Sequence, residues 1–346
     1  MKKRILAVLT AVMTVIGISA CGSQTGGANT TAAPAAPASA PAETEAAKTE
    51  KEKADWPTGT VELVVPYNAG GDTDLYCRAI AEAMSKKTGA TFVVSNITGA
   101  SAMNAAVDVL EGPADGSKFL FGHNTYLSYT ANGTAAVDVV TELKPAGAIV
   151  ADNSLVLLAY KDTGFKTIQD VVDAGNAGQD IRLTCGVGSF PYYCVMKVLN
   201  ESGAKVRRVE TGSLVGEHIV GCMSGQAEMT LGQYVAVKEY VESGDFNVIG
   251  VIADELPKGM ENFQTFKAQG VNVVEPKYYC FWASPNMDDS IIQAFTETLE
   301  SIKDDEGLRE VLANYFAEAN YMNPQEMQNM EEKTVAEMTE FFKNNQ

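Results

Sequence analysis

The chain has 346 residues, of which 26 are basic and 44 acidic, so its formal net charge is −18 at pH 7. This acidity argues against a surface that binds nucleic acid or anionic lipid by electrostatics. The sequence contains two histidines and no H-E-x-x-H, G-x-S-x-G or EF-hand pattern. It therefore predicts no metal site, no cofactor and no serine-type catalytic centre.

The first 20 residues predict an export signal. Lys2, Lys3 and Arg4 precede an apolar run that is too short for a stable membrane span. The run ends in ISAC, which resembles a bacterial lipobox, so we expect Cys21 to become the lipid-modified first residue of the mature protein. From residue 22 to about residue 54 the chain is rich in Ala, Pro, Thr and Glu, which predicts a disordered tether. The lipid would then be the sole anchor of an extracytoplasmic protein at the bacterial cell membrane, on the cell surface or in a periplasm.

Beyond the tether, apolar runs alternate with helical patterns. Strands are predicted at 60–66, 91–95, 119–122, 146–151, 155–160, 181–185, 206–210, 228–231, 247–251 and 279–283, and only helices after that. The length of this part favours two domains. Alternating strands and helices predict parallel sheets flanked by helices, with ligands at the carboxyl ends of the strands. We therefore expect two α/β lobes with a ligand cleft between them.

Five cysteines follow Cys21, an odd number without a C-x-x-C pair. Buried free thiols are the expected state, and one disulfide is left open. These cysteines are Cys77, Cys185, Cys194, Cys222 and Cys280.

Three turns between a predicted strand and a helix are rich in glycine or small residues. In PYNAGGDTD, Gly70 and Gly71 allow a tight turn and a close backbone approach to a ligand. The absence of a P-loop lysine excludes a nucleotide site, and Asp72 and Asp74 suit helix-capping positions. This turn alone fits a capped structural turn as well as an anion site. The turns SNITGASAMNAA and CGVGSFPYY repeat the pattern, and three such turns in two halves of the chain favour a ligand-lined cleft.

These motifs resemble the solute-binding proteins of tripartite tricarboxylate transporters, the TctC or Bug family. The likeness covers P-x-x-x-G-G-x-x-D at 66–74, ADG at 114–116, GVGSFPYY, TGS at 211–213, SGQAEMTL at 224–231 and FWASP at 281–285. It implies a type II periplasmic-binding-protein fold, a two-lobe Venus flytrap that delivers a small organic carboxylate to a membrane permease. The ligand classes considered are di- and tricarboxylates, aromatic acids and amino acids. Lobe 1 would comprise 55–154 and 283–346, and lobe 2 would comprise 155–282. A monomer is expected.

The resemblance also implies the ligand-binding residues, which act mainly through backbone N–H groups and hydroxyls. They are Tyr67, Asn68, Ala69, Gly70, Gly71, Asp74, Ser101, Ala102, Gly188, Ser189, Thr211 and Gly212. Asn124 and Thr125 join them because they follow a predicted strand at its carboxyl end, and Tyr192 because it stands where the family often has a histidine. This chain departs from the family at two places. Tyr192 stands where the family often has a histidine, and the turn that contains a lysine in the family contains Glu210 and no lysine here. The departures predict a more aromatic cleft and favour a monocarboxylate or a bulkier acid over a highly charged tricarboxylate.

Two alternatives remain at this point. One is a solute receptor of the TRAP or ABC class, although a characteristic lobe 2 arginine of the TRAP receptors is missing from GVGSFPYY. The other is a hydrolase that uses Cys185 as nucleophile and His123 as base. The sequence does not identify the acid that is bound, the disulfide status or the resting state of the lobes.

Overall fold

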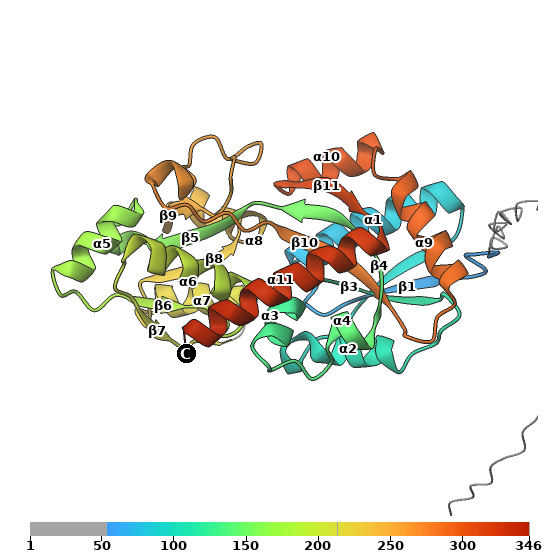
Figure 1. Cartoon of the computed structure of the whole chain (residues 1–346). Coiled ribbons are helices and arrows are strands. Elements are labelled where there is room, and N and C mark those ends of the chain that lie inside the picture. The colour runs from blue at the N-terminus through green and yellow to red at the C-terminus, as the bar shows by residue number, and fades with distance from the viewer. Residues whose placement is uncertain (1–53, 213, 346) are drawn as a thin grey trace, which may run out of the picture. The chain divides into compact units, whose positions relative to one another are not determined.

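Two mixed β-sheets form the centres of two lobes that lie side by side in Figure 1. This computed structural model describes residues 54–212 and 214–345, which fall within a single unit of the chain. The predicted signal at 1–20, the lipidation of Cys21 and all of the tether except residue 54 lie outside the described residues. The arrangement of two α/β lobes agrees with the predicted fold class.

The sheet of lobe 1 has the order β11-β4-β10-β3-β1-β2. Strand β1 is nearly fully buried and runs parallel to both β2 and β3, as a central strand covered on both faces should. The strands are β1 (Val61–Val65), β2 (Phe92–Asn96), β3 (Lys118–His123), β4 (Lys144–Asp152), β10 (Lys277–Ala283) and β11 (Ala317–Met322). The helices are α1 (Asp72–Thr88), α2 (Met103–Leu110), α3 (Thr125–Ala131), α4 (Val139–Glu142), α9 (Asp289–Ser301), α10 (Glu306–Asn314) and α11 (Pro324–Asn344), with the 3₁₀ turn η1 (Ala100–Ala102).

The sheet of lobe 2 has the order β7-β6-β8-β5-β9. Its strands are β5 (Leu155–Tyr160), β6 (Arg182–Thr184), β7 (Arg207–Val209), β8 (Met229–Gln233) and β9 (Phe246–Val251). Its helices are α5 (Ile168–Asn176), α6 (Phe190–Ser202), α7 (Val215–Met223) and α8 (Tyr234–Glu242), with 3₁₀ turns η2 (Lys161–Thr163) and η3 (Lys267–Gln269).

Three predictions about the fold are wrong. The sheets are mixed, because β10 runs antiparallel to β3 and β4 while β5 runs antiparallel to β8 and β9. Strand β11 follows β10, where only helices were expected, and its half-exposed edge position explains the weak apolar signal. The chain also re-enters the lobe 1 sheet at Lys277, so β10 belongs to lobe 1 and not to lobe 2, which was expected to extend to residue 282.

The last helix, α11, connects the lobes on one side (Figure 1). It begins with an Asn323 cap and Pro324, and it packs on β4 and α3 of lobe 1. Its C-terminal end reaches α6 of lobe 2, where the rings of Phe342 and Tyr192 stack with centroids 6.4 Å apart. Phe341 meets Tyr193 edge to face at 5.0 Å. These apolar contacts hold one edge of the two lobes together.

Candidate functional site

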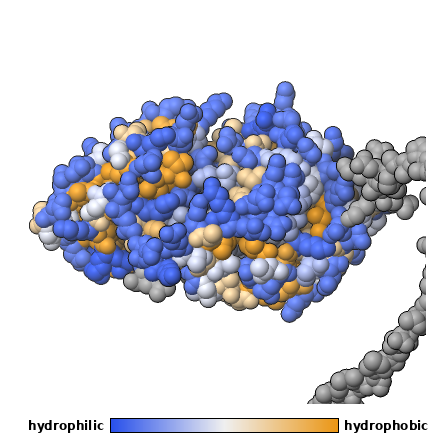
Figure 2. Space-filling view, viewed as in Figure 1, coloured by the Kyte–Doolittle hydropathy of each residue, from blue (hydrophilic) through white to orange (hydrophobic). Residues whose placement is uncertain are grey.

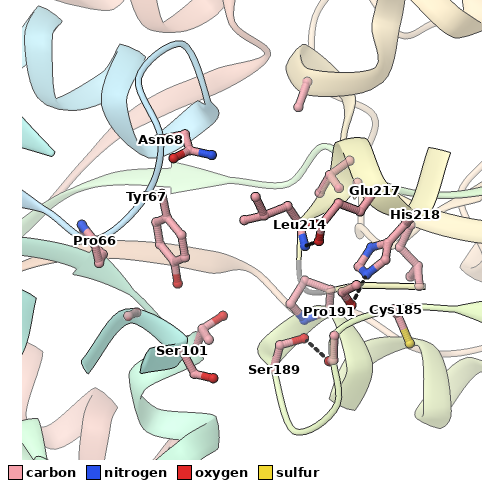
Figure 3. Close-up of a pocket in the computed structure, with 18 of the residues that line it drawn as sticks. Pro66, Tyr67, Asn68, Ser101, Cys185, Ser189, Pro191, Leu214, Glu217 and His218 are labelled. Carbon is pink, nitrogen blue, oxygen red and sulfur yellow. Dashed lines mark hydrogen bonds between the residues drawn. The ribbon is translucent and has the colours of Figure 1, made fainter. Parts of the chain in front are cut away.

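A cavity of about 730 Å³ is lined by turns at the carboxyl ends of strands from both sheets. Figure 3 shows Pro66, Tyr67, Asn68 and Ser101 of lobe 1 facing Ser189, Pro191, Leu214 and His218 of lobe 2. Ligands of open α/β sheets bind at this end of the strands, and the volume is that of a small-molecule site. The space-filling view shows a mainly hydrophilic exterior on the face that it presents (Figure 2).

Seven of the predicted ligand-binding residues line this cavity and eight do not. Those that line it are Tyr67, Asn68, Ser101, Ala102, Thr125, Ser189 and Gly212. Those outside its lining are Ala69, Gly70, Gly71, Asp74, Asn124, Gly188, Tyr192 and Thr211. Contacts within the protein account for each residue of the second group except Ala69.

The first glycine turn uses its own N–H groups. The N–H of Gly70, at φ +83°, donates to Asp74 Oδ2 at 2.9 Å, and the N–H of Gly71 points to the Asn68 carbonyl at 3.4 Å. Asp74 is 2% exposed and also accepts from Arg78 at 2.8 and 2.9 Å and from Asn96 Nδ2 at 3.0 Å. The expectation that these two glycine N–H groups face a ligand is therefore not supported. The turn instead presents Tyr67 and Asn68 to the cavity.

The second turn of lobe 1 carries unusual backbone geometry. Ala100, Ser101 and Ala102 have φ values of +47°, +53° and +75°, directly after Gly99 at +107°. The left-handed region costs a non-glycine residue roughly 1–2 kcal/mol. All four residues line the cavity. Strained backbone of this kind concentrates at functional sites, so the geometry supports a binding role for this turn.

The end of β3 supplies a neutral histidine. His123 is 5% exposed, its ring stacks on Tyr67 with centroids 5.0 Å apart, and its Nδ1 accepts the Thr125 N–H at 3.2 Å. Burial, reinforced by nearby Lys277, lowers the pKa of His123 well below its ordinary value. Asn124 does not line the cavity; its Oδ1 accepts the N–H of Tyr278 on β10 at 2.9 Å.

An ion pair between buried Lys277 and partly buried Asp72 links β10 to α1 beside the cavity. Lys277 Nζ lies 2.6 Å from Asp72 Oδ2, and the Tyr279 hydroxyl donates to the same oxygen at 2.5 Å. Burial alone would raise the pKa of Asp72, but Lys277 and these hydrogen bonds outweigh it and hold the pKa well below its usual range. Asp72 and Lys277 both line the cavity, and neither was predicted as a site residue. The aspartate was interpreted as a helix cap, and Lys277 lies outside every motif.

The glycine turn of lobe 2 joins the lobes. The Gly188 carbonyl accepts from Ser128 Oγ at 2.6 Å and from Asn132 Nδ2 at 3.0 Å, both on the lobe 1 side. Ser189 caps α6, accepting the Tyr192 N–H at 3.3 Å, and it also lines the cavity. The Tyr192 ring packs on Phe342 of α11 and does not line the cavity. The aromatic rings that do line it are Tyr67, Tyr129 and His123.

The remaining wall of lobe 2 is acidic. Glu210 and Glu217 line the cavity, and Glu210 pairs with Arg208 at 2.7 Å. The Glu217 carboxylate accepts the Leu214 N–H at 3.0 Å. Burial lowers the pKa of His218, whose Nε2 lies 3.1 Å from the Gly212 carbonyl. Thr211 points elsewhere, with its hydroxyl 2.6 Å from that of Thr184.

Cys185 lines the cavity but lacks the properties of a nucleophile. It is 3% exposed, and burial raises the pKa of its thiol to about 12, so the thiolate is scarce at neutral pH. All five cysteines of the described residues are buried and free.

Two α/β lobes with a polar cavity between their strand-end turns define a two-lobe solute-binding receptor. Residues 76–345 match the family model described as the tripartite tricarboxylate transporter family receptor, TctC, and the chain belongs to this family. This confirms the resemblance seen in the sequence.

Solved structures support the same fold. The periplasmic binding protein BugD is 21% identical, with a TM-score of 0.73 over 84% of this chain and 98% of BugD. MatC from Rhodopseudomonas palustris, with bound malate, is 19% identical, with a TM-score of 0.73 over 83% of this chain and 100% of MatC. A second R. palustris protein, with adipate, is 23% identical, with a TM-score of 0.73 over 82% and 96% of the two chains. Among the described residues, no helix combines the length and the apolarity needed to span a membrane.

Proposed function

We propose that this protein is an extracytoplasmic, lipid-anchored receptor that captures a small organic carboxylate in the interlobe cavity and delivers it to a tripartite tricarboxylate-type permease. The observation that carries the proposal is the cavity of about 730 Å³ lined by polar turns of both lobes. Family membership and the malate and adipate bound by two structural relatives support a carboxylate as ligand. The buried thiol of Cys185 argues against the hydrolase alternative.

Lobe 1 offers the better environment for the ligand carboxylate. Asn68, Ser101 and Thr125 bring hydrogen-bond donors to the cavity, and the Lys277 ammonium, which is paired with Asp72, lines the same cavity. The strained turn at 100–102 brings main-chain groups to the same wall. The opposite wall carries Glu210 and Glu217, which disfavour a second carboxylate unless a positively charged group of the ligand lies next to it.

Thermal unfolding with a panel of mono-, di- and tricarboxylates tests the ligand class, followed by calorimetric titration of each acid that stabilises the protein. A ligand at about 100 times its Kd adds about 2.7 kcal/mol to the free energy of unfolding. For a domain of this size we expect a Tm increase of roughly 5–10 °C. If sugars or metal ions stabilise the protein and no carboxylate does, the proposed ligand class is wrong.

The anchor and the permease need separate tests. Cys21→Ser should move the protein from the membrane fraction to the soluble fraction without changing ligand affinity. Co-purification of the ligand-loaded receptor with a large integral membrane subunit would support delivery to a permease. Membrane retention of the Cys21→Ser protein would contradict the lipid anchor.

A further inference from the structure

Gln233 is a buried amide without a partner at the wall of the cavity. It ends β8, is 4% exposed, and lines the cavity together with Gly232 and Ala236. Neither its Oε1 nor its Nε2 makes a hydrogen bond. Within the described residues, the hydroxyl of Ser95 is the one other fully buried side-chain polar atom in that state.

Local structure does not account for this side chain. Gln233 stands at the N-cap of α8, yet it makes no capping hydrogen bond, and glutamine is not a favoured capping residue. Buried polar side-chain atoms in proteins are nearly always hydrogen-bonded, because an unpaired one is costly. An apolar side chain of similar volume would suit a purely structural position better. The amide is therefore explained best by a partner that is bound only during function.

The chemistry of an amide restricts that partner. Nε2 donates and Oε1 accepts, so both are satisfied only by a group that offers an oxygen and a donor close together. The surrounding charges favour a positive donor. Three carboxylates line the cavity, those of Asp72, Glu210 and Glu217. Lys277 pairs with Asp72 and Arg208 pairs with Glu210, so these two cations leave an excess of one negative charge among the described groups.

We infer that Gln233 determines ligand specificity, and that the preferred ligand is a carboxylate that also carries an ammonium group, with a hydroxyl as the weaker substitute. The inference rests on the proposed carboxylate-receptor function. The lobe 1 turns hold one carboxylate, and Gln233 pairs with the donor and an adjacent oxygen at the lobe 2 wall. A hydrogen bond to a charged group is stronger than a neutral one. Acids with an ammonium group should therefore bind more tightly than acids with a hydroxyl, and these more tightly than acids with neither.

Matched acids that differ only in one substituent test the inference. Succinate, malate and aspartate carry hydrogen, hydroxyl and ammonium at the same carbon, and glutarate, 2-hydroxyglutarate and glutamate repeat the series with a longer chain. Calorimetric titration of the wild-type protein should give the order ammonium, hydroxyl, hydrogen, with about tenfold or more between the first and the last.

Gln233→Met keeps the volume and removes both polar atoms. This variant should bring the affinity ratio within each series close to one while changing the affinity for the unsubstituted acid less than threefold. It should also raise the Tm of the ligand-free protein, since the unpaired amide is gone. Gln226→Met is the matched control, because Gln226 is exposed, belongs to the same lobe and pairs with Ser224. The control should leave the ratios unchanged.

The outcomes separate the two proposals. If the wild-type protein binds none of these six acids or others of the panel, the carboxylate-receptor function fails and the inference fails with it. If the acids bind and Gln233→Met preserves the ratios, the receptor function stands and the role of Gln233 is refuted. A wild-type preference for the unsubstituted acids would also refute it.

Discussion

Glu331 is a buried acid whose replacement should stabilise the protein. It lies on α11, is 1% exposed, and accepts a hydrogen bond from Trp282 Nε1 at 2.7 Å. Burial raises its pKa to about 8 from an ordinary value of 4.5, against the opposing effect of the tryptophan hydrogen bond. Glu331→Gln keeps the shape and the acceptor oxygen but cannot ionise.

The pKa gives the sign and the size of the effect. The folded state holds this proton more tightly than the unfolded state, so the contribution of Glu331 to stability is complete below pH 4.5 and is lost as pH rises through 8. Each unit of pKa difference corresponds to about 1.36 kcal/mol. The advantage of Glu331→Gln over the wild type should therefore grow by up to about 3 kcal/mol between pH 5 and pH 8.

Urea unfolding at several pH values measures this difference. Glu340→Gln is the control, since Glu340 is exposed on the same helix and, unlike Glu332, is not among the charges that raise the pKa of Glu331. The control should follow the wild-type profile. If the difference between Glu331→Gln and the wild type is the same at pH 5 and pH 8, the reasoning from burial is wrong.

Three further predictions follow from the turns and the ion pair. Ala100→Gly should leave the thermal stability unchanged or raise it, because glycine relieves the strain of a φ of +47°. The control Ala336→Gly, in the exposed middle of α11, should cost about 1 kcal/mol. Equal losses of stability in the two variants would contradict the strain at Ala100. Gly188→Ala should cost about 2 kcal/mol, since its Cβ would lie 2.4 Å from the side-chain amide of Asn132 at the end of α3. Gly133→Ala has a similar φ but open space around the added Cβ, so it should cost about half as much. Lys277→Met removes the cation beside the partly buried Asp72 carboxylate, which keeps the Tyr279 hydrogen bond, and should lower stability at pH 7 by up to about 3 kcal/mol. This loss should shrink as pH falls below about 4, where carboxyl groups of the unfolded chain become protonated. The pKa of Asp72 is depressed in the folded protein, so its paired charge stabilises the fold above this pH and stops doing so as the carboxyl is protonated. A loss that is the same at pH 3 and pH 7 would contradict the role of the ion pair.

Patterns of local sequence were enough to predict the ten strands from β1 to β10 within a few residues. Buried strands consist mainly of apolar residues, and turns with glycine mark where they end. They missed β11, whose residues are half exposed at a sheet edge. They also could not give strand direction, because the same apolar run fits a parallel or an antiparallel neighbour. The placement of β10 in lobe 1 therefore depends on pairing with β3 and β4.

The three small-residue turns were identified in the sequence as cavity walls, and parts of each line the cavity. Which atoms of those turns remain available was decided by tertiary contacts. Asp74 takes the Gly70 N–H, and the Gly188 carbonyl serves the lobe contact, so neither glycine presents that group to a ligand. Lys277 and Gln233 carry no local motif, since each is a single polar residue beside an apolar strand. Only the folding of both sheets around one cavity gives these two residues a place in the site.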